Sequence, residues 1–123
     1  MTQKYHAHIY FESSQQSTAE ALYLAIHTLV LPRTRLGQFH LRLVGPHSLP
    51  MFTVMFEASE KKEFTEFLVR NRDGLSILIH EDTGDDYHDH THGAEWLGKI
   101  LPINFEHFER IKNDKSALVF PEP

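Results

Sequence analysis

Four segments of this sequence alternate apolar and other side chains with a period of two, and this pattern limits the possible folds more than any other feature. The segments cover residues 5–11, 38–44, 51–57 and 75–80. Such alternation is typical of strands that bury one face. Apolar residues at helical spacing occupy 16–31 and 60–70. The order strand, helix, strand, strand, helix, strand predicts an α+β fold, a ferredoxin-like βαββαβ sandwich with two helices on one face of a four-stranded antiparallel sheet.

Each predicted strand has one apolar face that the helices can cover. These faces consist of Ala7, Ile9 and Phe11; Phe39, Leu41 and Leu43; Phe52, Val54 and Phe56; and Ile77 and Ile79. Their agreement supports the fold, because independent local patterns point to one core. In this fold the fourth strand pairs with the first. We expect the second strand to run opposite to the first, which places the turn at Pro46 and His47 at the end where the first strand begins.

The length of 123 residues fits one domain over 1–123, with a core over about 5–101 and a C-terminal tail over 102–123. We expect a polar loop over 81–92 and a short helix or turn over 93–101. The net charge is −5 and no basic cluster indicates a nucleic-acid partner. No apolar run reaches the ~20 residues that span a membrane. Residues 1–4 lead directly into the first strand, so we expect a cytoplasmic protein without a signal peptide.

Histidine is frequent in this chain, with ten residues, and cysteine is absent. His6 and His8 fall on the face of the first strand opposite the apolar one. They lie ~6–7 Å apart at the backbone, which is close enough for two imidazoles to bind one ion. His80 ends the neighbouring strand on the same face, and His47 lies in a turn expected at the same end. The predicted polar loop adds His88, His90 and His92, which can fold back over this site.

The chemistry of the cluster follows from the residue type. Neutral imidazole is a preferred ligand of zinc, iron(II) and copper. Three or four histidines without a thiolate fit a catalytic metal site with an open position better than a closed structural site. A carboxylate such as Glu81 could complete a two-histidine, one-carboxylate set or orient a ligand histidine. A solvated polar patch and a proton-shuttling pocket remain alternatives.

Six short motifs occur in order along the chain. They are His6-Ala7-His8-Ile9-Tyr10-Phe11, Gly45-Pro46-His47, Leu78-Ile79-His80, Thr83-Gly84-Asp85, Asp89-His90 and Ala94-Glu95-Trp96-Leu97-Gly98. With these motifs the sequence resembles the DOPA 4,5-dioxygenase family from about Tyr5 to Leu101. The resemblance implies a small ferredoxin-like protein that uses iron(II). It also implies a reaction in which a catechol binds the metal through its two oxygens and O2 inserts beside the diol, which opens the ring.

The resemblance also implies roles for the matching histidines. We expect His8, His47 and His80 to be metal ligands. His6 is then a fourth ligand or the general base that takes the catechol proton. His90 is a hydrogen-bond donor outside the ligand set or an acid for the ring-opened intermediate. The expected metal is iron(II), and a purified sample can carry zinc or another divalent metal instead.

One departure from the family pattern follows the histidine of the fourth strand. Glu81 and Asp82 stand where the family usually has proline and asparagine. This change predicts a looser turn. The added negative charge disfavours an acidic substrate near that position.

The expected partners are a small aromatic catechol and O2. Tyr10 and Trp96 would form walls for the aromatic ring. We also expect a homodimer, because the histidine-bearing face carries the apolar residues Met51, Met55 and Leu78. Two other functions remain open: a dimeric, non-enzymatic module that binds a metal or a small aromatic acid, and a zinc hydrolase that works without O2.

Overall fold

The structure is a computed structural model, and it describes residues 3–43 and 45–103. The strands are β1 (Lys4–Tyr10), β2 (Thr34–His40), β3 (Met51–Glu57), β4 (Ser76–Glu81) and β5 (Ala94–Leu97). The helices are α1 (Gln16–His27), α2 (Lys61–Asn71) and α3 (Asp86–Asp89); the 3-10 turns η1 (Ser13–Gln15) and η2 (Ala58–Glu60) lead into α1 and α2. None of the helices in this part of the chain has the length and apolar character needed to cross a membrane. The predicted tail lies outside the described residues from position 104 onward.

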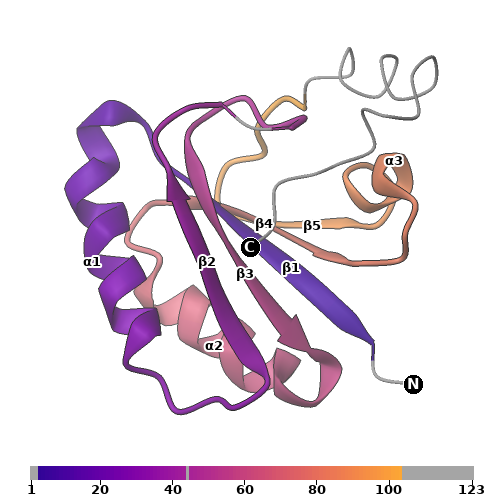
Figure 1. Ribbon diagram of the computed structural model, residues 1–123. Coiled ribbons are helices and arrows are strands. Elements are labelled where there is room, and N and C mark those ends of the chain that lie inside the picture. The colour runs from indigo at the N-terminus through magenta and orange to yellow at the C-terminus, as the bar shows by residue number, and fades with distance from the viewer. Residues whose placement is uncertain (1–2, 44, 104–123) are drawn as a thin grey trace.

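All the strands pair antiparallel in one sheet, in the order β2-β3-β1-β4-β5. Helices α1 and α2 lie on one side of this sheet, toward the left in Figure 1. The arrangement confirms the predicted α+β class. Its first four strands have the order expected for a ferredoxin-like fold, with β4 and β3 on either side of β1.

The sheet has a fifth strand that the sequence did not predict. Residues 94–97 were expected to form a short helix or turn, and this expectation is wrong. They pair along β4, with Ala94 opposite His80 and Leu97 opposite Ile77. Leu97 packs against the core on the helix side, whereas Trp96 packs on the other face. Alternation over four residues is too short to identify a strand; the open edge of β4 supplies the hydrogen-bonding partners that stabilise it.

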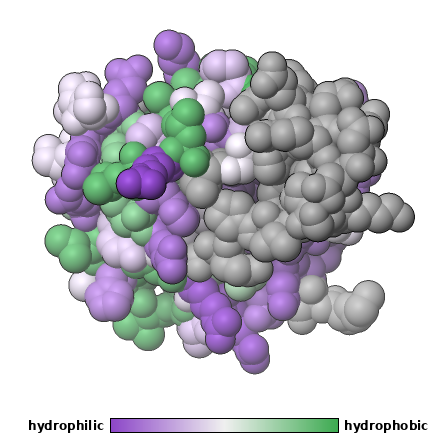
Figure 2. All heavy atoms as spheres, turned by 45° about the horizontal axis from the view of Figure 1, so that its top comes forward, coloured by the Kyte–Doolittle hydropathy of each residue, from purple (hydrophilic) through white to green (hydrophobic). Residues whose placement is uncertain are grey.

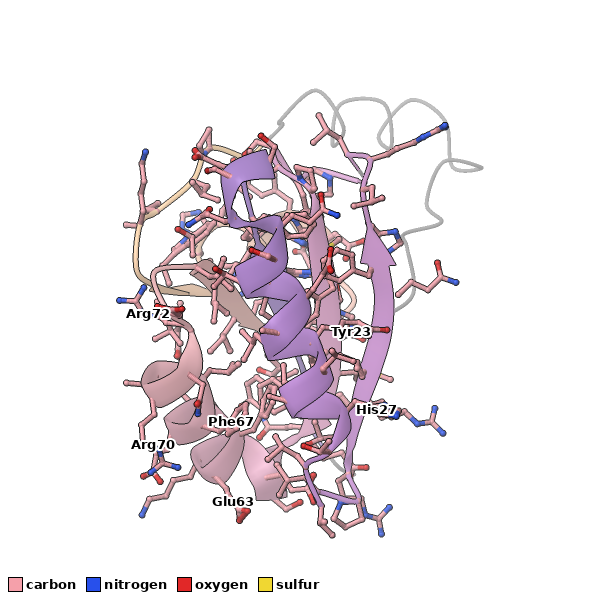
Figure 3. All side chains as sticks on the ribbon, turned by 90° about the vertical axis from the view of Figure 1, so that its left-hand side faces the viewer. Tyr23, His27, Glu63, Phe67, Arg70 and Arg72 are labelled. Atoms are coloured by element: carbon pink, nitrogen blue, oxygen red, sulfur yellow. The ribbon has the colours of Figure 1, made fainter. Side chains whose placement is uncertain are left out.

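The main core lies between the sheet and the two long helices. The strands contribute Ala7, Ile9, Phe52, Val54, Phe56, Ile77 and Ile79, and the helices contribute Ala19, Leu22, Ile26, Phe64 and Leu68. Burial of each large apolar side chain stabilises the fold by ~1.5–3 kcal/mol. Tyr23 links α1 to β2, because its hydroxyl donates to the carbonyl oxygen of Gly37 at 2.8 Å. Figure 3 shows Tyr23 on the side of α1 that faces β2.

The second strand begins four residues earlier than predicted. β2 starts at Thr34, and its pairing with β3 shifts between Leu36 and Phe39, which marks a bulge. Leu41 and Leu43 follow the strand and are each 62% exposed, so their expected place in the core is wrong. The bulge changes which residues face inward, and an alternating apolar pattern does not reveal an inserted residue. Figure 2 shows apolar and hydrophilic surface interspersed on the side of the molecule that forms the top of Figure 1.

The direction of β2 also differs from the prediction. Thr34 and Tyr5 both lie opposite Phe56, so β2 and β1 begin at the same end of the sheet and run in the same direction. The cause is α1, which returns the chain to the end where β1 began. The connection between β2 and β3 therefore lies at the end where β1 finishes, at the top of Figure 1.

Candidate metal centre

The histidines lie on the face of the sheet opposite the main core, as the alternation in β1 predicted. Directly paired residues of neighbouring strands place their side chains on one face. His6 pairs with His80 in β4, and His8 pairs with Thr53 in β3. His80 is therefore the cross-strand neighbour of His6. Helix α3 lies toward this part of the sheet, away from α1 (Figure 1).

Five histidine rings meet on this face. The ring centroids of His8 and His47 lie 4.3 Å apart, those of His80 and His90 4.5 Å, and those of His6 and His80 5.3 Å. His8, His47, His80 and His90 are at most 6% exposed, whereas the side chain of His6 is 18% exposed. All the histidines that the sequence predicted as metal ligands or catalytic residues thus come together in one cluster. Four of its rings are buried, and His6 is partly exposed to solvent.

His47 joins the cluster by a route that the sequence did not predict. The connection that carries it starts at the far end of β1, yet His47 folds back over the sheet. It forms an isolated antiparallel bridge with Ile103, and its Nδ1 lies 2.6 Å from the hydroxyl oxygen of Tyr10. His47 thus meets His8, as expected, and also His90, with ring centroids 4.3 and 5.3 Å apart respectively, although the reason given for its position was wrong.

The ring nitrogens form two groups that could each hold a metal ion. One group contains His6, His8 and His80, and the other contains His8, His47 and His90; within each group the candidate ligand atoms lie within 4.8 Å of one another. His8 belongs to both. The predicted ligand set of His8, His47 and His80 draws on both groups and stays a prediction.

Hydrogen bonds outside the cluster orient three of the rings. The Nδ1–H of His80 donates to the carbonyl oxygen of Glu81 at 3.0 Å, and that of His90 donates to the carbonyl oxygen of Asp86 at 2.8 Å. Because a carbonyl oxygen only accepts, both Nδ1 atoms carry the proton and both Nε2 atoms carry a lone pair. Ligand histidines of metal sites are commonly held in this way.

Thr53 orients His8 in the same manner. Its hydroxyl donates to the sulfur of Met51 at 3.2 Å and lies 2.8 Å from Nδ1 of His8. A thioether sulfur is a weaker acceptor than an imidazole nitrogen, so the hydroxyl can donate to Nδ1 of His8 or accept from it. When Nε2 of His8 binds a metal, Nδ1 carries the proton and the hydroxyl oxygen accepts from it. Thr53 was placed on this face by the sequence without a role. Its position directly opposite His8 in the antiparallel pair is the signal that could have indicated one.

The Nε2 atoms of His8 and His80 lie 2.9 Å apart, and without a metal Nε2–H of His8 donates to the lone pair of His80 Nε2. Two nitrogens bound to one ion at ~2.0–2.1 Å each lie roughly 3–3.5 Å apart. A metal ion can replace the shared proton, because His8 can then carry its proton on Nδ1, beside the hydroxyl of Thr53. The residues present thus fit a divalent metal at this position.

Burial favours the neutral form of three histidines of the cluster. It lowers the pKa of His8 well below the ordinary histidine value, and the neighbouring His47 and His80 lower it further. Burial likewise lowers the pKa of His80. It lowers the pKa of His6 too, an effect that the carboxylate of Asp82, 3.8 Å from the His6 ring, partly offsets. Neutral imidazole is the form that binds a metal.

The loop after β4 is folded so as to position His90. Gly84 takes a φ of 93°, and the carboxylate of Asp85 accepts from the backbone N–H of His88 at the start of α3. Asp89 is buried and accepts from both the backbone N–H and the hydroxyl of Thr83, at 3.0 and 2.6 Å. These local bonds, typical of capped turns, fix the helix that ends beside His90.

Tyr10 and Trp96 stack beside the cluster, with ring centroids 5.8 Å apart. Tyr10 is 1% exposed, and burial raises its pKa, so its hydroxyl stays neutral. A role for either residue in binding substrate stays a prediction. Met51 and Leu78, on which the homodimer expectation partly rested, are buried within the chain itself, and the dimer is untested.

Comparison with known proteins identifies the family of the chain. A model of the Dopa 4,5-dioxygenase family matches residues 5–107. The chain belongs to this family. The resemblance noted in the sequence is thereby confirmed for most of the chain.

Two curated relatives and one solved structure are similar to the chain. An uncharacterized 21.2 kDa protein of Botryotinia fuckeliana is 35% identical over 70% of this chain and 51% of its own length. A DOPA 4,5-dioxygenase of Amanita muscaria is 27% identical over 96% of this chain and 54% of its own length. The chain thus spans about half the length of the curated relatives it matches. The crystal structure of a candidate dioxygenase from Nostoc punctiforme is 30% identical, with a TM-score of 0.83, over 89% of this chain and 94% of that protein.

Proposed function

We propose that this chain is a metal-dependent dioxygenase that opens the ring of a catechol beside its diol. The observation that carries the proposal is the pair of buried Nε2 atoms of His8 and His80, which lie 2.9 Å apart, close enough to bind one metal ion together. Membership of the Dopa 4,5-dioxygenase family supports the reaction class. The names of the Amanita relative and the Nostoc structure support it as well.

Of the two groups of ring nitrogens, we favour His6, His8 and His80 as the metal ligands. This group contains the two Nε2 atoms that lie 2.9 Å apart, and its third ring, His6, is partly exposed and so leaves access for a substrate. Three histidines leave open positions on a metal, as a catalytic site requires. Iron(II) held there would supply the redox chemistry that O2 needs to react with an aromatic ring. The alternative ligand set is His8, His47 and His80, and metal binding by variants of His47 and His80 distinguishes the two sets.

We assign to His90 the transfer of the catechol proton. Its Nδ1–H donates to the Asp86 carbonyl, so Nε2 is the basic nitrogen, and its ring lies 4.5 Å from that of His80. A neutral imidazole can accept a proton from a catechol hydroxyl and return it to the ring-opened product. If His6 is not a ligand, its partly exposed ring can take this role instead.

The chain also excludes water and holds the site rigid. Four of the five rings are nearly fully buried, and Tyr10 and Thr53 bond to His47 and His8 respectively. A dry, fixed site strengthens every electrostatic interaction with the substrate and limits side reactions of oxygen.

The protein is first loaded with iron(II) under anaerobic conditions. The test is then O2 uptake that depends on an added catechol, with DOPA, caffeic acid and protocatechuic acid as the substrates. We expect uptake with a coloured ring-opened product, and its loss in the His80→Ala variant. Stoichiometric metal binding with no uptake for any catechol would contradict the proposal. Such a result would favour the alternative of a module that binds a metal or an aromatic acid without turnover.

A further inference from the structure

One row of side chains crosses the whole histidine-bearing face. Arg35 in β2 lies opposite Met55 in β3, and Met55 lies opposite His6 in β1. His6 lies opposite His80 in β4. Neighbouring strands are ~4.8 Å apart, so the backbones of Arg35 and His6 are separated by roughly 10 Å. A cation therefore lies on the same face as the candidate metal centre, two strands away from it.

A groove of about 290 Å³ lies at this side of the cluster. It is lined by Lys4, Pro32, Arg33, Arg35, Met55 and Glu57. Arg33 lies 3.8 Å from the carboxylate of Glu57. Among the described residues, neither Lys4 nor Arg35 forms an ion pair with a carboxylate. The groove thus holds more positive than negative charge, and Met55 connects it to His6.

The charge on the β4 side of the cluster has the other sign. Asp82, which follows β4, lies 3.8 Å from the His6 ring. An anionic group on a substrate would be repelled from β4 and attracted toward β2. The charge distribution therefore favours one orientation of an acidic substrate, with its ring at the histidines and its anionic end over Met55.

We propose that this groove is the subsite for the carboxylate of the substrate and that Arg35, supported by Lys4, binds it. The proposal rests on the proposed function, since the ring must lie at the histidine cluster. The guanidinium matches a carboxylate with two parallel hydrogen bonds. Because Arg35 lies two strands away from His6, a carboxylate that extends from the ring reaches the Arg35 side of the face more readily than one bonded directly to the ring.

The experiment measures binding without turnover. The full chain, loaded with iron(II) in the absence of O2, is titrated with 3-(3,4-dihydroxyphenyl)propanoate and with its methyl ester, which differ in one negative charge. We expect the acid to bind about tenfold tighter, the size of a charge-assisted hydrogen bond. Protocatechuate should lack most of this advantage over its own methyl ester.

Arg35→Met should remove the preference by weakening the acid alone, and Arg35→Lys should keep part of it. Unchanged affinity for the ester shows that the site is intact. The matched control is Arg70→Met, an exposed arginine of α2 on the other side of the sheet (Figure 3), which should keep the full preference.

Equal affinity for acid and ester in the unaltered protein, or a preference that survives Arg35→Met, would overturn this proposal alone. A parallel loss of ester affinity in Arg35→Met would also overturn it, because Arg35 would then support the site structurally. If neither compound binds, the proposed function fails and the subsite fails with it.

Discussion

The Nε2 atoms of His8 and His80 face one another at 2.9 Å, while the other nitrogen of each ring is committed to a hydrogen bond outside the pair. His8 bonds to Thr53 and His80 to the carbonyl of Glu81. Neither ring can rotate to avoid the other without losing its own bond. The fold thus holds two ring nitrogens together in a buried site, where a metal ion can replace the proton that they share.

Replacement of His80 should therefore abolish metal binding, whereas replacement of His47 should not. In the favoured arrangement His80→Ala removes a ligand, so metal affinity should fall by more than the ~100-fold that loss of an outer partner costs. His47→Ala should change it by less than about tenfold. Metal content after dialysis and competition with a chelator measure both. Equal loss in the two variants would favour the predicted set of His8, His47 and His80. Loss in His47→Ala alone would favour the group with His90.

A second prediction concerns stoichiometry. The two groups of ring nitrogens share His8. Because Nδ1 of His8 donates to Thr53, only Nε2 can bind a metal, and one lone pair serves one ion. We expect the histidine cluster to bind one metal per chain. Titration of metal-free protein with cobalt(II), followed by absorption, should reach its end point at one equivalent. A second equivalent bound with similar affinity and lost in His8→Ala would contradict this.

The centre of the site was predictable because strand alternation and antiparallel pairing are local rules. Alternation puts His6 and His8 on one face, and pairing of the first and fourth strands then brings His80 to them. The role of Thr53 was missed because it depends on register with His8, which alternation alone does not determine. The position of His90 depends on the capped turn around Asp85, and the sequence predicted only a loop there.

The errors in the fold have physical causes of the same kind. The bulge between Leu36 and Phe39 shifted the pairing of β2, and Leu41 and Leu43 are exposed because β2 ends at His40. An inserted residue leaves no mark on a pattern of period two. β2 runs in the same direction as β1, whereas the opposite direction was predicted. The connection that carries His47 was therefore expected at the wrong end of the sheet. His47 still reaches His8, because the connection folds over the face and pairs with Ile103.

The metal-free protein should lose stability as the pH falls below neutrality. Burial lowers the pKa values of His8, His80 and His6 below the ordinary 6.5, so the unfolded chain binds more protons than the folded one in this range. The free energy of unfolding therefore decreases as the pH falls below about 6.5. Each histidine contributes a loss of up to ~1.4 kcal/mol for every unit by which folding lowers its pKa.

Asp86 has the opposite effect on the pH dependence of stability. Burial, and secondly the charge of Asp89, raises its pKa to about 6. Between pH values of about 4 and about 6 its carboxyl group is therefore protonated more in the folded chain than in the unfolded one. Asp86 is half-buried, and three histidines outweigh it. Urea unfolding of metal-free protein at pH 5, 6 and 7.5 measures how steeply the free energy of unfolding depends on pH. This dependence should be weaker in His8→Asn. Stability that is constant or increases toward pH 5 would contradict the expectation.

Thr53→Val should weaken metal binding although Thr53 is not a ligand. Valine has nearly the same shape but cannot accept from Nδ1–H of His8, so the ring is no longer held in the tautomer that presents Nε2. Loss of such an outer partner typically lowers metal affinity ~10–100-fold. The buried N–H left without its acceptor should also lower the free energy of unfolding of the metal-free protein by ~1–3 kcal/mol. Thr53→Ser keeps the hydroxyl and is the matched control; chelator competition and urea unfolding measure the two effects. If valine and serine variants bind metal equally, Thr53 does not orient His8.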